Sequence, residues 1–364
     1  MSIYIKKNKK VRIYLSNVTG LGATKLLQSL LPYIEKSDRF ESSEICLPDS
    51  GDLSEYNPIS LNTQTSIFKR KLPHLLSRVL ECLFPDQKYN DGTPILVLGD
   101  IPLRISKGKQ VVFLQSPLLV KPWLKINKLG EIKYLISKLI FFFNLPYVNA
   151  VIVQTSVMKE KLIYLFPILK DKVYVLPQPV PEWIKKEIKT DRTDIYTRDS
   201  KLNLIYPAAY YPHKNHRILR NINPSTQDWP KLKLSLTINE SQNPAPSINW
   251  VHCSGQLNQN TLLKAYHDAD ALLFLSKEES FGFPLIEAMY LGLPIVCPDL
   301  PFARVLCGDD AIYFDPNNIE SLRLGIIYLK SRLIDGWHPN WNKQIKKIPN
   351  NWATAADEML DLFI

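Results

Sequence analysis

The sequence predicts an α/β protein of two Rossmann-like domains with parallel sheets. With 364 residues, the chain is long enough for two domains that each bury a core. Residues 271–298 have the order strand, loop, helix, strand, which is the half-unit of a parallel sheet. The segment 177–200 is rich in proline and charge and lacks apolar periodicity, as linkers do. We therefore expect an N-terminal domain at 1–180, a linker at 181–200, a C-terminal domain at 201–345 and a final helical segment at 346–364.

The first domain begins with a strand and a glycine-bearing loop. Val11–Ser16 is an apolar run of strand length, and the loop after it contains Gly20 and Gly22. Such a loop lets the backbone approach a phosphate or an acceptor closely, although two glycines alone more often mark a plain turn. The polar segment 49–72 is expected to be a surface loop. Further strands are expected at 94–99, 110–114, 149–154 and 172–176, with helices at 23–34, 72–84 and 156–166.

The loop and helix at 276–291 carry the strongest chemical signal. Gly282 lets the backbone turn, and Pro284 stands where a first helical residue is expected. Free backbone amides and the positive end of the helix dipole at this point make a site for a phosphate or diphosphate. We assign five residues to the binding of this phosphate-bearing donor, namely Ser280, Phe281, Gly282, Phe283 and Leu285.

Two glutamates flank this helix start. Glu279 lies in the loop, and Glu287 lies about one turn into the helix. A carboxylate next to bound phosphate is favourable where it accepts hydrogen bonds from sugar hydroxyls, so the pattern indicates a sugar nucleotide. For either glutamate alone, the simpler interpretation is a first-turn acid that supports the helix dipole, or a solvated helix position.

The whole stretch resembles the E-x7-E signature of retaining GT-B glycosyltransferases, especially family 4. The matching segments are ESFGFPLIEAM at 279–289, GLPIV at 292–296 and GDDAIYFDP at 308–316. The resemblance implies the GT-B fold, with two Rossmann-like domains facing across a cleft. It also implies that the first domain binds the acceptor, the second binds the nucleotide-sugar donor, and the helix at 352–364 crosses back to the first domain.

The resemblance also assigns roles to individual residues. Lys214 matches the family lysine that contacts the donor diphosphate, whereas the expected arginine is replaced near Ala209. Glu279 would contact the donor sugar or its developing positive charge, and Glu287 the ribose. A lone lysine before a helix is otherwise usually solvated. The nucleobase would sit at Ser254 and Gly255.

Other positions depart from the family pattern or lie further from its motifs. Gln115 stands near the place of an acceptor-site histidine, and glutamine cannot act as a base near neutral pH. Gly20 and Gly22 would lie in the glycine loop that the family places across the cleft. His213 and His216 are interpreted as structural rather than catalytic. The form PxxYxPHKNH at 207–216 resembles a subset that acts on bacterial surface polysaccharides.

The net charge of +10 is concentrated in the first half of the chain. Residues 1–200 carry 30 Lys and Arg against 19 Asp and Glu, a net of +11, whereas residues 201–364 carry 15 against 16, a net of −1. The excess is greatest in residues 101–150, which have eight basic residues and one acidic residue. This distribution indicates an anionic partner of the first domain, and we find no nucleic-acid-binding motif.

The basic and aromatic segment 118–143 allows two interpretations. Ile132, Leu135, Ile136, Leu139, Ile140 and Phe143 fall on one helical face, which is typical of a core helix with solvated lysines. Alternatively, the segment is a peripheral surface for an anionic membrane or a lipid acceptor. The regional charge favours the membrane interpretation, with Lys121, Trp123, Lys125 and Lys128 as the membrane-facing residues.

The sequence predicts neither a secretory signal nor a membrane span, because Asn144, Pro146 and Asn149 interrupt the best apolar stretch. Five cysteines are scattered without metal-binding spacing, which indicates reduced thiols in a cytoplasmic protein. No Asp-x-Asp metal motif sits at a strand end, so we expect no metal and no cofactor beyond the nucleotide-sugar co-substrate. We expect peripheral attachment to the inner face of the cell membrane.

The resemblance to family 4, together with these observations, implies a metal-independent hexosyltransferase. It would move a hexosyl group, with retention, from a nucleotide-sugar to a sugar hydroxyl of a lipid-linked oligosaccharide or surface polysaccharide, as in O-antigen biosynthesis. Two alternatives stay open. One is a sugar-nucleotide epimerase of similar fold, and the other is a non-catalytic donor-binding subunit of a transferase complex.

Overall fold

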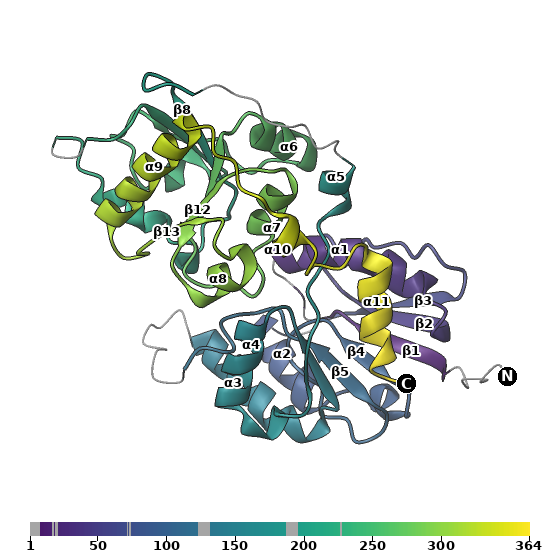
Figure 1. The fold of residues 1–364 in the computed structure, drawn as a ribbon. Coiled ribbons are helices and arrows are strands. Elements are labelled where there is room, and N and C mark those ends of the chain that lie inside the picture. Colours follow the sequence, from purple (N-terminus) through teal and green to yellow (C-terminus); the bar gives the residue numbers. More distant parts are fainter. Residues whose placement is uncertain are drawn as a thin grey trace. The chain divides into compact units, whose positions relative to one another are not determined.

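A computed structural model describes residues 8–16, 18, 21–70, 72, 74–122, 132–186, 196–225 and 228–364. The chain divides into two compact units, each with a parallel sheet and a core of its own (Figure 1). The first unit consists of Met1–Pro179 together with Pro349–Ile364, and the second of Val180–Ile348. The predicted pair of Rossmann-like domains with parallel sheets is confirmed.

In the described part of the first unit, seven parallel strands form the sheet in the order β3-β2-β1-β4-β5-β6-β7. Helices connect parallel strands and cover the sheet, so the inner strands read as short apolar runs buried on both faces. The strands are β1 (Asn8–Tyr14), β2 (Phe40–Pro48), β3 (Thr63–Phe68), β4 (Ile95–Val97), β5 (Gln110–Phe113), β6 (Ala150–Val153) and β7 (Val173–Val175).

The prediction of a surface loop throughout 49–72 is wrong for β3. This strand pairs in parallel with β2, so that Ser66 lies opposite Cys46. None of its six side chains is fully buried, because β3 is the edge of the sheet. Main-chain hydrogen bonds to β2 hold this strand in place, so its side chains need not be buried. Its sequence TQTSIF accordingly lacks the apolar run by which a buried strand is recognised.

The helices of the first unit surround this sheet, and one core cluster joins side chains of α2, α3 and α4 to the strands. The longer helices are α1 (Leu21–Lys36), α2 (His74–Leu83), α3 (Ile132–Asn144), α4 (Ser156–Leu165) and α11 (Trp352–Asp361). Short 3-10 helices are η1 (Gln87–Asn90), η4 (Leu145–Tyr147) and η5 (Pro167–Leu169).

The C-terminal helix α11 packs against α1, although the two are more than 300 residues apart in sequence (Figure 1). Ser37 Oγ donates to Asp357 Oδ1 at 2.6 Å, and Arg39 Nε lies 2.5 Å from Asp361 Oδ1. The rings of Phe40 and Phe363 meet edge to face at 6.0 Å. Apolar and polar contacts together attach the end of the chain to the first unit.

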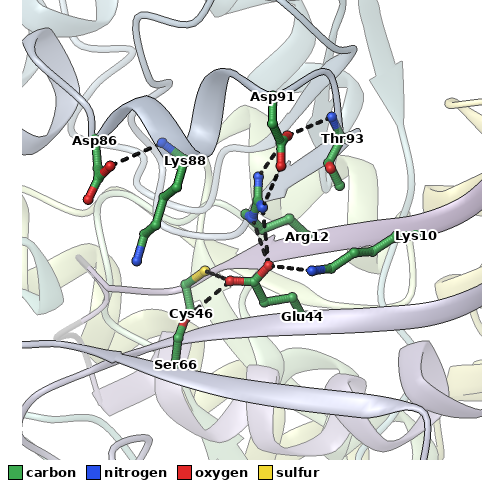
Figure 2. A network of polar contacts seen from close by, with 9 residues as sticks. All are labelled: Lys10, Arg12, Glu44, Cys46, Ser66, Asp86, Lys88, Asp91 and Thr93. Carbon is green, nitrogen blue, oxygen red and sulfur yellow. Dashed lines mark hydrogen bonds and ion pairs between the residues drawn. The ribbon is translucent and has the colours of Figure 1, made fainter.

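A buried arginine links the middle of the first sheet to η1 (Figure 2). The Arg12 guanidinium lies 3.1 Å from Glu44 Oε2 and 3.1 Å from Asp91 Oδ2, and Lys10 Nζ lies 2.8 Å from the same Glu44 oxygen. Burial opposes ionisation of Asp91, but the hydrogen bonds from Arg12 and Thr93 and the charge of Arg12 together outweigh it and lower the pKa of Asp91 to about 2. Each charge in this cluster is therefore compensated, as a buried ion requires.

In the second unit as described, six parallel strands form the sheet in the order β10-β9-β8-β11-β12-β13. The first strand in the chain, β8, lies inside the sheet beside β11, which is the arrangement of a doubly wound fold. The strands are β8 (Leu202–Tyr206), β9 (Leu232–Leu236), β10 (Val251–Cys253), β11 (Ala271–Leu273), β12 (Ile295–Pro298) and β13 (Ile312–Phe314).

The helices of the second unit include one in the segment expected to be a linker. This helix, α5 (Glu182–Lys185), buries Ile184 completely in the core of the unit. The others are α6 (Gln259–His267), α7 (Phe283–Tyr290), α8 (Pro301–Cys307), α9 (Ile319–Ile334) and α10 (Asn342–Ile345), with 3-10 helices η6 (Pro212–Lys214), η7 (His216–Asn221) and η8 (Glu240–Gln242).

The expected apolar face of the helix at 132–144 is only partly correct. Ile140 is buried as expected, but Ile132, Leu139 and Phe143 are exposed. The lysine expected in solvent, Lys138, is fully buried. In the described part of the chain, we find no helix long and apolar enough to cross a membrane.

Candidate functional site

Lys214 and Glu279 form an ion pair at the carboxyl edge of the second sheet. Lys214 ends η6, which follows β8, and Glu279 lies in the loop between β11 and α7. Lys214 Nζ lies 2.6 Å from Glu279 Oε1, and the two side chains are 17% and 11% exposed. Attraction across such a partly buried pair is stronger than in water, because the local dielectric constant is lower. The structure thus brings the predicted cation and the predicted acid into contact.

The backbone around Lys214 is fixed from several sides. The buried Tyr206 hydroxyl donates to the carbonyl of Lys214 at 2.8 Å, and burial holds the pKa of Tyr206 well above its usual range. Asn215 takes a left-handed conformation with φ of 56°, which asparagine tolerates better than most residues. Its Nδ2 donates to the carbonyl of Pro316 at 3.0 Å. The lysine therefore projects from a rigid loop.

The loops after β8, β11 and β13 are hydrogen-bonded to one another. The carbonyl of His213 accepts from the backbone N–H of Lys277 at 2.8 Å and from Ser276 Oγ at 3.2 Å. Lys277 Nζ donates to Asn317 Oδ1 at 2.6 Å. Lys277 and Asn317 were not among the predicted site residues. For Lys277, the sequence offered one indication, namely that it is a basic residue two positions before Glu279.

Helix α7 begins at a glycine that no other residue could replace without strain. Gly282 has φ of 88°, and a Cβ added there would lie 3.2 Å from Leu285 Cδ1. Pro284 occupies the first turn, and within the described residues no side chain caps the helix. Phe281 and Leu285 are buried in the core, whereas Phe283 is half-buried. The side chains of Phe281 and Leu285 are therefore not available to a ligand, and the Leu285 N–H already donates to the carbonyl of Gly282 at 2.9 Å.

Glu287 is a buried residue, so the simpler interpretation of a solvated helix position is wrong. It is 7% exposed, and its Oε2 accepts from the Tyr266 hydroxyl at 2.6 Å. Tyr266 comes from α6 and is itself fully buried. Burial and the neighbouring Glu287 carboxylate raise the pKa of Tyr266 well above its usual range, so this hydroxyl stays a donor. Sequence reasoning missed Tyr266 because nothing local links it to Glu287.

Ser254 and Gly255 follow the edge strand β10, with β9 and β8 between them and β11. Their backbone N–H groups donate to Leu236 and Ile238 at 2.9 Å each, which continues the pairing with β9. Gly255 has φ of 73°. These two residues thus lie at the carboxyl edge of the same sheet, but they are not in the group around Lys214.

His216 is buried in an aromatic environment. Its ring lies 4.9 Å from that of Tyr206 and 5.6 Å from that of Tyr210, and neither ring nitrogen has a hydrogen-bond partner among the described residues. His213 stacks on Tyr211 with ring centroids 5.7 Å apart. Burial, with a smaller effect of the Lys214 charge, lowers the pKa of His216 to about 4.

In the first unit, Gln115 connects the ends of two strands. Its backbone N–H donates to Asp100 Oδ1 at 2.6 Å, and its Nε2 donates to the carbonyl of Leu98 at 3.0 Å. Asp100 has φ of 70°, and burial raises the pKa of its carboxyl group. Gln115 thus has a structural role at the carboxyl edge of the first sheet.

Several predicted positions fall on residues that are not described. Gly20, Trp123, Lys125 and Lys128 lie outside the described residues. Gly22 was expected in a loop, but it lies in the first turn of α1 with open space around its Cα. Among the described residues, we find no group of three or more His, Cys, Asp or Glu side chains placed to hold a metal ion.

The sequence and the fold both resemble known glycosyltransferases. Residues 247–334 match the family of glycosyl transferases group 1, and this segment contains Glu279, Glu287 and Ser254. The O-antigen chain mannosyltransferase B of Escherichia coli is 31% identical over 88 residues, which are 24% of this chain and 23% of that protein. The O-antigen chain mannosyltransferase RfbU of Salmonella typhimurium strain LT2 is 30% identical over 79 residues, 22% of each chain.

The structural similarity extends over nearly the whole chain. Sucrose-phosphate synthase from Thermosynechococcus elongatus superposes with a TM-score of 0.66 at 15% identity, covering 98% of both chains. WaaG, a glycosyltransferase involved in lipopolysaccharide biosynthesis, superposes with a TM-score of 0.60 at 13% identity, covering 96% of this chain and 95% of its own. The chain has the GT-B fold. In sequence, by contrast, it spans about a quarter of the curated relatives it matches.

We expect the ring of His216 to stay uncharged well below neutral pH. Between its ordinary pKa of 6.5 and its folded pKa of about 4, the unfolded chain binds a proton here and the folded chain does not. This residue therefore lowers the free energy of unfolding as pH falls from 6.5 to 4, by up to about 3 kcal/mol. NMR titration of the ring protons and denaturant unfolding at several pH values measure both effects.

Two variants serve as comparisons for this titration. His216→Phe should remove the decrease in the free energy of unfolding between pH 6.5 and 4. His338→Asn, which changes an exposed histidine, should leave that decrease as it is in the wild type. A His216 ring that titrates near pH 6.5 in the folded protein would contradict the expectation.

Proposed function

We propose that this protein is a retaining hexosyltransferase that uses a nucleotide-sugar and acts in the assembly of a bacterial surface polysaccharide such as O-antigen. The observation that carries the proposal is the ion pair of Lys214, at the end of η6, with Glu279, in the loop that leads to the N-terminus of α7. The matched segment of a group 1 glycosyltransferase and the GT-B fold support it. Because the similar curated proteins are named as mannosyltransferases, we propose mannosyl as the transferred group.

The site supports stabilisation of a departing diphosphate. A donor diphosphate would take the place of Glu279 at Lys214 Nζ and accept hydrogen bonds from the backbone amides of Gly282 and Phe283 at the start of α7. The charge of Lys214 and the helix dipole would then oppose the negative charge that grows on the leaving oxygen. We propose that these groups suffice without a metal ion.

The released Glu279 would have a second task. Its carboxylate can accept hydrogen bonds from hydroxyls of the donor sugar or stabilise positive charge at the anomeric carbon. In the proposed step, the bond from that carbon to the diphosphate oxygen breaks and a bond to the acceptor oxygen forms on the same face. The acceptor hydroxyl proton passes to the departing phosphate oxygen, so atoms and charge balance without a protein nucleophile.

Glu287 is proposed to bind the ribose hydroxyls of the donor. Its hydrogen bond from Tyr266 fixes the carboxylate orientation from the protein side, and a carboxylate is a suitable acceptor for a vicinal diol. We place the nucleobase near Ser254 and Gly255, which lie at the same sheet edge. The first unit, including the strand ends near Gln115, is proposed to bind the acceptor, a lipid-linked oligosaccharide or a growing polysaccharide.

A transfer assay with added chelator tests the overall proposal. We expect one nucleoside diphosphate among GDP, UDP, dTDP and ADP to raise the melting temperature, and its mannose conjugate to donate to a lipid-linked acceptor. Activity should be unchanged in excess EDTA, and NMR of the product should show the anomeric configuration of the donor. Melting shifts without turnover would instead support a donor-binding subunit, and an altered donor sugar without acceptor would support an epimerase.

Replacing Lys214 tests the origin of leaving-group stabilisation. Lys214→Ala should lower kcat by about 10²–10³-fold, which is typical for the loss of one group that stabilises developing charge. The exposed Lys264 of α6 offers a matched control, and Lys264→Ala should change kcat by less than about twofold. If Lys214→Ala lowers kcat less than about threefold, Lys214 does not have this role.

The Glu287–Tyr266 pair makes a different prediction. Glu287→Gln should raise the donor KM more than it lowers kcat, because it weakens binding that is common to ground state and transition state. Tyr266→Phe should also raise the donor KM, but by a smaller factor, because it removes a hydrogen bond to the Glu287 carboxylate and leaves the carboxylate itself in place. Steady-state kinetics with a varied donor concentration would argue against ribose binding if the KM of Glu287→Gln equals that of the wild type.

A further inference from the structure

Helix α2 packs Cys82, Val79 and Leu83 on the core of the first unit, but it also turns a row of large apolar residues toward solvent. Leu76, Leu80 and Phe84 recur at every fourth position and are all exposed, Phe84 to 71%. Ser77 and Glu81 in the same turns are buried. Since residues four apart share one face of a helix, the exposed side chains form one apolar stripe.

Buried hydrogen bonds fix this orientation. The Glu81 carboxylate accepts from Ser77 Oγ at 2.9 Å, from the Tyr14 hydroxyl at 2.9 Å and from Ser16 Oγ at 3.1 Å. Rotating α2 to bury its leucines would move Glu81 away from Tyr14 and Ser16 at the end of β1. The apolar stripe is therefore held outward by the polar face.

Helix α3 packs Ile140 and Phe141 in the core, and it likewise buries polar residues while it exposes large apolar ones. Lys138 is 0% exposed, and its Nζ donates to the carbonyl of Lys121. Asn144 is also fully buried and donates through Nδ2 to the carbonyl of Cys82 at 2.9 Å and to that of Pro102 at 2.7 Å. Phe142 and Phe143, in contrast, are exposed to 50% and 55%, with Ile132 and Leu139 exposed on earlier turns.

The two helices are neighbours, so their exposed residues lie on adjoining elements (Figure 1). We define the α2–α3 face as the exposed residues Leu76, Leu80, Phe84, Ile132, Leu139, Phe142 and Phe143. A protein in water ordinarily buries phenylalanine and leaves lysine exposed. A chain that buries Lys138 and exposes these rings is suited to a surface that meets an apolar phase.

The charge of the region indicates which apolar phase this is. Glu81 is the only acidic residue within His74–Leu83 and Ile132–Asn144, and it is buried. Lys133 on α3 is exposed, and residues 101–150 contain eight Lys and Arg against one Glu. A second copy of the face would bring like charges together, whereas anionic lipid headgroups attract lysines while the acyl region accepts the aromatic rings.

We propose that the α2–α3 face docks the protein on the surface of an anionic lipid bilayer. The rings and leucines enter the boundary between headgroups and acyl chains, and Lys133 meets the headgroups. This surface differs from the residues that the sequence indicated, of which only Lys121 is described and supplies a backbone carbonyl to Lys138. The proposal concerns the first unit alone and does not depend on the transfer reaction.

Vesicle flotation of the full chain tests the proposal. We expect the protein to float with vesicles of phosphatidylcholine and phosphatidylglycerol, and much less with phosphatidylcholine alone. The double variant Phe84→Asp, Phe143→Asp should lower the vesicle partition coefficient by about tenfold or more, because binding scales with inserted apolar area. Lys133→Glu should weaken binding to the anionic vesicles only.

A control comes from two residues of α9 in the second unit whose exposure is close to that of Phe143. Leu324 and Tyr328 are 52% and 51% exposed, and Leu324→Asp, Tyr328→Asp should leave flotation unchanged. All variants should keep the wild-type melting temperature and its shift with nucleoside diphosphate, which separates lipid docking from the donor site.

Three results would overturn the proposal. The first is a wild-type protein that stays with the soluble fraction in the presence of anionic vesicles. The second is equal loss of flotation in the α9 control variant. The third is a dimer in sedimentation analysis that Phe84→Asp, Phe143→Asp dissociates, which would show that a second copy covers this face.

Discussion

The contact between Lys214 Nζ and Glu279 Oε1 is the interaction on which the proposed donor site depends. It joins the loop after β8 to the loop before α7, and the loops around it are tied together through His213, Lys277 and Asn317. A partly buried lysine needs an anionic partner, because an uncompensated charge is costly in a low dielectric. In the proposed reaction a diphosphate takes over that function and frees the carboxylate for the donor sugar.

Much of the second unit is readable from its sequence because its signals are local. The run before Ser276, the turn at Gly282 and the proline after it fix strand, loop and helix without reference to distant residues. The proximity of Lys214 to Glu279 is different. Only the family resemblance assigned both residues to the same donor. The structure explains their proximity, because β8 lies beside β11 in the sheet. Neighbouring parallel strands end at the same edge, which brings together residues 65 positions apart.

Features that depend on distant partners were missed or misjudged. Tyr266 gains its importance from Glu287 on another helix, and β3 is held by the backbone of β2 rather than by apolar residues of its own. The periodicity of α3 predicted that leucine and phenylalanine would point inward. Lys138 and Asn144 instead find buried backbone carbonyls, so their hydrogen bonds set the orientation of the helix.

The most direct test of the donor site is a crystal structure with the nucleoside diphosphate that stabilises the protein. We predict a phosphate oxygen within hydrogen-bond distance of Lys214 Nζ, further phosphate contacts to the amides of Gly282 and Phe283, and Glu279 displaced from the lysine. An intact Lys214–Glu279 pair, with the nucleotide bound elsewhere, would contradict the proposed role of the pair.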